Sequence, residues 1–181
     1  WMRVVDNHSM PGRLPIENGV VRCQGPWWVD YNHAPPGAGY LQLLMAMATR
    51  GAPGEAMREI AGDNRFIAGG FPTDFTDARI TVRCRGELEV AGTGFHVLLQ
   101  GSKDGITSGW LLIGQPIAVN PEWTETTVAC VPEPGQWTSL GSRHDRTDTY
   151  GEKPLRDILG NVNVNIHLLR FPVKPRPMGP I

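Results

Sequence analysis

The stretch Gly94-Phe-His-Val-Leu-Leu-Gln100 decides the fold class, because the character of its side chains alternates at every second position. Successive side chains of a β-strand point to opposite faces of the sheet. One face of this strand therefore carries Phe95, Val97 and Leu99, and the other carries His96, Leu98 and Gln100. We predict a strand with one apolar face against a core and a second face that gathers polar groups.

Two further stretches alternate in the same way and also collect polar side chains on one face. Asn161-Val-Asn-Val-Asn-Ile-His-Leu168 sets asparagines and a histidine against apolar residues, and Ala78-Arg-Ile-Thr-Val-Arg-Cys-Arg85 sets arginines and a threonine against them. Guanidinium groups suit carboxylates, whereas amides suit hydroxyls and other amides. Together the stretches predict a solvent-facing polar surface that binds a polar or acidic ligand through Arg83, Arg85, His96, Gln100, Asn163, Asn165 and His167.

Two alternatives to a binding surface stay open for these strands. Antiparallel sheets commonly leave one face in water without any ligand, and the same face can instead be covered by the N-terminal arm. A central strand of a sandwich would also bury His167 against another polar side chain.

Turn-forming residues divide the chain into short segments, since it contains 22 glycines and 16 prolines. The expected strands lie at residues 20–23, 27–30, 40–49, 78–85, 95–100, 110–113, 124–131 and 162–171, and the expected short helices lie at 53–61 and 153–159. The segment 40–49 also fits a short helix, but the Gly and Pro signals around it favour a strand. This spacing predicts an all-β fold, an antiparallel jelly-roll β-sandwich with one or two short helices.

The length of 181 residues suits one well-packed domain. We predict a single β-sandwich domain over residues 1–181, with an N-terminal arm at about residues 1–26 and a proline-rich C-terminal strap at 172–181. A net charge of −1 and a pI of about 6.6 give no bulk attraction to nucleic acid or to an anionic membrane. No apolar run reaches the length of a membrane span and no secretory signal is visible. We expect a soluble protein whose compartment stays open, extracellular and periplasmic locations included.

The three cysteines, Cys23, Cys84 and Cys130, lie far apart in the sequence and form no Cys-x-x-Cys pair. This spacing argues against a zinc site or a redox dithiol. One disulfide with one free thiol and three reduced thiols both stay open, because Cys84 and Cys130 each lie inside an expected strand.

The order of elements in residues 70–173 resembles the galactose-binding-like jelly-roll sandwiches, and within them laminin domain IV and carbohydrate-binding modules. The features that carry the resemblance are the strand 95–100, the Trp-led segment Trp123–Val131, Gln136-Trp137, the Pro-Leu-Arg-Asp-Ile-Leu turn at 154–159 and the closing strand 162–171. The resemblance implies a β-sandwich that binds glycans or partner proteins, often with a structural calcium ion. The acidic cluster expected for calcium near the N-terminal strands is not evident here, so we assign no cofactor.

The densest polar cluster of the chain is Ser142-Arg-His-Asp-Arg-Thr-Asp148, which its composition places in a loop. A catalytic interpretation would make His144 a general base that Asp145 or Asp148 orients. The alternative is a surface loop whose charges satisfy one another. As ligand-binding candidates the cluster offers Arg143, His144 and Asp145, because binding residues concentrate on loops.

A second cluster, Trp27-Trp28-Val-Asp-Tyr-Asn-His33, alternates aromatic rings with hydrogen-bonding groups. Sugars stack their apolar C–H faces on such rings while polar side chains bind the hydroxyls. The binding candidates are Trp27, Trp28, Asp30, Tyr31 and His33. The alternative is that one tryptophan anchors the core and the other seals the loop. One histidine and one carboxylate do not define a metal site.

Familiar catalytic and nucleotide-binding motifs are absent, including GxSxG, HExxH and GxxxxGK[ST]. The leading hypothesis is a non-catalytic module that binds a polar ligand, a glycan foremost. The second is a structural or assembly subunit that docks on partner chains or on its own copies through its extended termini. The third is a small enzyme that would assemble Arg83, His96, His144 and His167.

Overall fold

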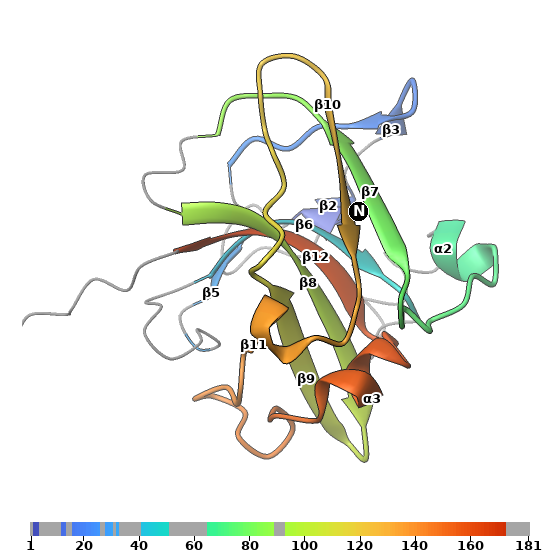
Figure 1. The fold of residues 1–181 in the computed structure, drawn as a ribbon, viewed down its shortest axis with the longest axis vertical. Coiled ribbons are helices and arrows are strands. Elements are labelled where there is room, and N and C mark those ends of the chain that lie inside the picture. Colours follow the sequence, from blue (N-terminus) through green and yellow to red (C-terminus); the bar gives the residue numbers. More distant parts are fainter. Residues whose placement is uncertain are drawn as a thin grey trace, which may run out of the picture.

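The computed structural model describes residues 2–3, 12–13, 16–25, 28–30, 32, 41–50, 65–88 and 93–172. The expected helix at 53–61 and all but the first residue of the C-terminal strap lie outside these ranges. Within these ranges the fold is an all-β antiparallel sandwich, as the sequence predicts (Figure 1). Of its two short helices, the one that ends at Leu159 was predicted and the one at Arg65–Ala68 was not. Within the described ranges, no helix has both the length and the apolar character needed to cross a membrane.

One large curled sheet forms the main layer, with the order β11-β9-β8-β12-β6-β1-β2 and with β5 also paired to β6. Its strands are β1 (Met2–Arg3), β2 (Gly12–Arg13), β5 (Trp28–Asp30), β6 (Leu41–Ala48), β8 (Thr93–Lys103), β9 (Ile106–Leu112), β11 (Trp137–Ser139) and β12 (Asn165–Pro172). All of its strand pairs are antiparallel. The segment 41–48 is thus a strand, the favoured interpretation of its sequence.

A second, narrower sheet lies across the first and consists of β7 (Arg79–Cys84) and β10 (Thr124–Ala129). Figure 1 shows this pair in front of the large sheet, with α3 (Leu155–Leu159) below it. A short hairpin joins β3 (Ile16–Glu17) to β4 (Val20–Val21), and α2 (Arg65–Ala68) precedes β7. A 3-10 turn, η1 (Pro134–Gln136), leads into β11.

The main core lies between the two sheets. Its centre is the face of β8 that carries Phe95, Val97 and Leu99, which packs with Val128 of β10 and Leu159 of α3. From β7, Ile80, Val82 and Cys84 pack against the same cluster. The alternation in the sequence therefore assigned the apolar faces of these strands correctly.

The other face of the large sheet carries a second, leucine-rich cluster. It consists of Leu41, Leu43, Leu98, Leu111, Leu140 and Leu169, all buried. Because β8 contributes to both clusters, each of its residues from Phe95 to Gly101 is buried. Strand β8 therefore lies inside the protein with apolar contacts on both faces.

The β8–β9 hairpin is longer than its sequence suggested. Strand β8 continues to Lys103, the chain turns at Asp104 and Gly105 with positive φ angles of 52° and 76°, and β9 begins at Ile106. Asp-Gly is a favoured pair for a two-residue hairpin turn. The residues around this turn are small or polar and do not alternate with apolar ones, so the sequence did not predict a strand there. These residues are in strands because the two segments pair with each other.

At one edge of the narrow sheet, the Gln115 side chain makes two hydrogen bonds to the backbone of Ala129. The Gln115 amide Nε2 donates to the carbonyl oxygen of Ala129 at 3.1 Å, and Gln115 Oε1 accepts from the Ala129 amide at 2.8 Å. These two bonds occupy the backbone groups of Ala129 that point away from β7.

All three cysteines lie in the described ranges, and none forms a disulfide. The Cys23 thiol donates to the Leu44 carbonyl and the Cys84 thiol to the Ala118 carbonyl. Burial raises the pKa of Cys130 to about 11 and also raises the pKa of Cys84. Of the two arrangements left open by the sequence, the structure has the one with three reduced thiols.

A methyl group added at residue 101 of β8 is expected to destabilise the protein. A Cβ on Gly101 would lie 2.5 Å from the Asn161 backbone oxygen, at the end of α3, where the backbone has little room to move. We expect Gly101→Ala to lower the free energy of unfolding by about 1–3 kcal/mol in urea titrations. Gly135→Ala is the matched control, because no atom lies within 4 Å of a Cβ built there. Equal stability of the two variants would contradict the packing described here.

Candidate functional site

The polar groups of β8 and β12 are buried rather than open to solvent. His96, Gln100 and His167 are exposed by only 3%, 7% and 6%. They lie on the face of the large sheet that carries the leucine-rich cluster. The prediction of a solvent-facing surface is therefore wrong for these three residues, whose face is covered. The N-terminal arm, which the alternative named as the cover, lies only partly within the described residues.

These buried polar groups bind one another and the backbone. The His167 imidazole donates through Nε2 to Gln100 Oε1 at 2.9 Å, so the expected burial of His167 against a polar side chain is confirmed. The His96 imidazole donates through Nδ1 to the Leu112 carbonyl at 3.0 Å. Gly94 leaves room for this ring, because a Cβ there would lie 2.1 Å from His96 Nε2. Hydrogen bonds of this kind offset the desolvation of buried polar groups.

The burial of His96 predicts a loss of stability in mild acid. Desolvation lowers the pKa of His96 below its ordinary value of 6.5, although the Leu112 hydrogen bond opposes this shift. The folded state therefore binds fewer protons than the unfolded state, and stability falls as the pH drops below 6.5. We expect His96→Gln, which cannot take up a proton there, to lose less stability than the native chain between neutral pH and pH values below 6.5 in urea titrations. An identical loss in both proteins would contradict this role for His96.

The two loop clusters that the sequence singled out meet in space at Arg143. Its Nη1 contacts Asp30 Oδ2 at 3.1 Å, while its Nε and Nη2 bind the two oxygens of Asp145 at 2.9 and 3.0 Å. Its guanidinium also lies over the Tyr150 ring, 5.2 Å from the centroid. We call this set, Asp30, Arg143, Asp145 and Tyr150, the Arg143 junction.

The backbone joins the same two segments. The His144 amide donates to the Asn32 carbonyl at 3.2 Å, and Asp30 Oδ1 accepts from the Asn32 amide at 2.9 Å. The Asp145 hydrogen bond is the main cause that raises the pKa of Arg143, and Arg143 in turn lowers the pKa of Asp145. The charges thus satisfy one another, as the structural alternative for this loop predicted.

The described geometry offers no support for catalysis by His144. The Asp145 carboxylate is held by Arg143, and among the described residues neither Asp145 nor Asp148 bonds to the His144 imidazole. The four residues of the enzyme hypothesis are also separated. His96 and His167 are buried in the large sheet, His144 is on the exposed loop, and Arg83 is on the outer side of the narrow sheet.

Several residues predicted to bind a ligand are not placed or have structural partners. Trp27, Tyr31 and His33 lie outside the described ranges, and of Trp28 only the backbone is described, paired with Leu43. The Asn163 side chain accepts from the Ser102 amide at 2.7 Å and donates to the Ser102 carbonyl at 3.2 Å. Asn165 is half-buried, and no described residue bonds to its Oδ1.

The outer face of the narrow sheet is the part of the predicted polar surface that solvent reaches. Trp123, 40% exposed, lies just before β10, and the guanidiniums of Arg83 and Arg85 lie 5.2 and 5.0 Å from its ring centroid. Beside them, the hydroxyls of Thr81 and Thr127 are hydrogen bonded at 2.9 Å. We call Arg79, Thr81, Arg83, Arg85, Trp123, Glu125 and Thr127 the arginine face.

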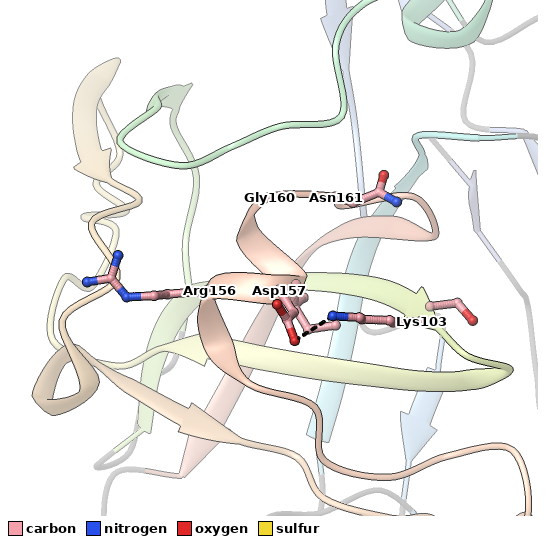
Figure 2. Close-up of a pocket in the computed structure, with 7 residues that line it drawn as sticks. Lys103, Arg156, Asp157, Gly160 and Asn161 are labelled. Carbon is pink, nitrogen blue, oxygen red and sulfur yellow. Dashed lines mark ion pairs between the residues drawn. The ribbon is translucent and has the colours of Figure 1, made fainter.

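A separate open hollow of about 360 Å³ lies between α3 and the tip of the β8–β9 hairpin (Figure 2). Its central charges are Lys103 and Asp157, which form an ion pair at 2.9 Å. In Figure 2 the Arg156 side chain points away from this pair. The hollow therefore presents a neutralised pair rather than an unpaired charge to a ligand.

No cluster of three or more His, Cys, Asp or Glu side chains with metal-binding geometry occurs within the described ranges. Comparison of the chain with family models, with curated proteins and with solved structures found no match. Among the described residues, the arginine face is an accessible cluster that combines an aromatic ring with several hydrogen-bond donors.

The sequence named Arg83 and Arg85 but missed the partner that joins them. Trp123 was identified only as the start of a strand-like segment, whereas pairing of Glu125 with Arg83 and Thr124 with Cys84 brings it beside Arg85. The sequence did contain a signal for this contact. A tryptophan precedes one expected strand, and arginines alternate along another expected strand that could pair with it. The contact between Asp30 and Arg143 had no local signal, because 113 positions separate them.

The Arg143 junction is expected to stabilise the fold rather than to bind a ligand. Arg143→Gln would remove the Arg143 charge from the buried Asp30 carboxylate, so we expect the free energy of unfolding to fall by about 3 kcal/mol. Arg146→Gln, an exposed arginine of the same loop, is the control and should change it by less than about 0.5 kcal/mol. Urea titrations of both variants measure the difference, and similar small effects would show that the junction contributes little.

Proposed function

We propose that the protein is a non-catalytic recognition module that binds a glycan on the arginine face. The observation that carries the proposal is Trp123, whose exposed ring lies beside the guanidiniums of Arg83 and Arg85. Large aromatic side chains are usually well buried. Both guanidiniums lie over the ring, so a sugar would stack its C–H face on the part of the ring that they leave exposed.

The groups around Trp123 suit the polar half of a sugar. Guanidinium edges donate hydrogen bonds, and the Thr81 and Thr127 hydroxyls both donate and accept. Cation–π contacts restrict the arginine side chains before a ligand arrives, which reduces the entropy lost on binding. The face is built on paired strands, and a rigid sheet positions side chains better than a loop does.

The other polar clusters support binding less well. The histidines of the large sheet are buried, and the Arg143 guanidinium is occupied by two carboxylates. The hollow in Figure 2 holds a neutralised ion pair and no aromatic ring. The aromatic cluster at residues 27–33 stays a prediction as a second place for the same function.

The assembly hypothesis stays the alternative function. It rests on arms that dock on partner chains, but β1 of the N-terminal arm pairs with β6 of its own chain at Met2 and Ala46. The strand β2 pairs with β1 in turn. This part of the arm already has a partner strand within the chain, which favours recognition over assembly.

A glycan array tests the proposal. The native chain is compared with Trp123→Ala, with Trp28→Ala for the loop cluster, and with Phe71→Ala as a matched control. Phe71 is 57% exposed and packs beside Phe66 near α2, so its loss removes an exposed ring elsewhere on the surface. We expect selective binding in the native chain that Trp123→Ala weakens at least about tenfold and Phe71→Ala retains. Stacking of a nucleic-acid base on an aromatic ring contributes roughly 1–3 kcal/mol, and a tenfold loss lies within that range.

Two results would overturn the proposal as stated. Binding that is lost in Trp28→Ala and retained in Trp123→Ala would move the site to the loop cluster. No binding by the native chain, together with a defined large oligomer in light scattering, would favour the assembly subunit. Thermal unfolding of each variant confirms that any loss of binding occurs in a folded protein.

A further inference from the structure

The charges on the arginine face do not balance. Strand β7 carries Arg79, Thr81 and Arg83 on its outer face, Arg85 follows directly after the strand, and all four are exposed. Strand β10 contributes a single carboxylate, Glu125, directly opposite Arg83. Three guanidiniums therefore face one carboxylate on this surface.

These arginines lack an acidic partner among the described residues, unlike three of the described cations. Lys103, Arg143 and Lys153 each pair with an aspartate within 3.3 Å. Arg79, Arg83 and Arg85 form no ion pair with any described residue, although Glu125 is a cross-strand neighbour of Arg83. Their positive charge is thus available to an external anion.

The contacts with Trp123 leave Arg83 and Arg85 exposed, so an external anion can reach their N–H groups. A guanidinium that packs its flat face near an aromatic ring keeps its N–H groups in its own plane. Those groups match the two oxygens of a carboxylate or of a sulfate. Arg83 and Arg85, at 5.2 and 5.0 Å from the ring centroid, therefore combine a fixed position with accessible donors.

The spacing of the arginines favours an extended ligand. Alternate residues of a strand are about 7 Å apart, so Arg79 and Arg83 lie about 13 Å apart along β7, and Arg85 extends the row beyond the strand. A row of this length is longer than one sugar. The Thr81 and Thr127 hydroxyls lie between the ends of the row and offer neutral partners there.

We infer that the ligand of the arginine face is an acidic oligosaccharide several sugars long, held by its carboxylate or sulfate groups on Arg79, Arg83 and Arg85. This inference rests on the proposed glycan-binding function and specifies its ligand. Single-stranded nucleic acid would also present anions and stacking rings. The chain carries a net charge of −1 and this face has one aromatic residue, whereas nucleic-acid grooves combine strong positive charge with several rings.

Paired probes of matched backbone test the inference by calorimetry. The first pair is a hexasaccharide of galacturonic acid and its fully methyl-esterified form, which removes the charge and keeps the backbone. A heparin-derived hexasaccharide tests sulfate in place of carboxylate, and an oligonucleotide of eight thymidines tests nucleic acid. We expect one acidic hexasaccharide to bind at least about tenfold more tightly than the methyl ester, and added salt to weaken it, because charged hydrogen bonds carry the difference.

The double variant Arg83→Gln/Arg85→Gln should lose that preference, with at least about tenfold weaker binding of the acidic probe and little change for the methyl ester. Arg156→Gln, an exposed arginine on α3, is the charge-matched control and should keep it.

The remaining outcomes separate this inference from the proposed function. Equal binding of the acidic and esterified probes, lost in Trp123→Ala, would support glycan recognition and overturn the acidic ligand. Loss of both probes in the double variant would show that the arginines only position Trp123, which also overturns it. Tighter binding of the oligonucleotide than of any sugar would overturn both proposals, and so would a failure of all probes.

Discussion

The burial of β8 on both faces is the constraint on which the rest of the structure depends. A strand in this position has no water to satisfy its polar side chains, so each of them needs a partner inside the protein. His96 binds the Leu112 carbonyl and Gln100 accepts from His167 for this reason. Gly94 and Gly101 provide space within the buried strand. Because they have no Cβ, the His96 ring packs against Gly94 and the Asn161 carbonyl packs against Gly101. Both layers of the protein, the inter-sheet core and the leucine-rich cluster, are built on this strand.

Alternation along the chain was sufficient to predict most strands but not the surroundings of their polar faces. The segments around β7, β8, β10 and β12 were found from alternation and from the turn signals between them, and the short helix that ends at Leu159 was found from the glycine that follows it. A surface strand and a buried strand with paired polar groups share the same period, so the pattern of His96 and Gln100 could not distinguish water from a partner side chain. That distinction depends on β12 pairing beside β8, which brings His167 to Gln100.

The candidate site shows the same limit at longer range. The sequence placed Arg83 and His167 on one predicted surface, whereas the structure puts them in different sheets, with the main core between the sheets. The alternation of side chains shows which residues of one strand share a face. The sheet to which that strand belongs depends on pairing with segments far away in the sequence. The Arg143 junction arises in this way, because the curl of the large sheet brings Asp30 of β5 to a loop that follows β11. The clusters were recognisable in the sequence, but their separation into a structural junction and an open face was not.

The Gln115 amide on Ala129 has a consequence for how the protein behaves among its own copies. The narrow sheet has two strands, and an unpaired strand edge is a template for adding a strand from another molecule, which leads to aggregation. Gln115 makes both bonds that an incoming strand would make at Ala129. Any strand that docks there must first displace a side chain tethered to the same chain and so at high local concentration. Gln115 thus disfavours the addition of a strand from another molecule at Ala129, on the edge of the sheet that carries the arginine face.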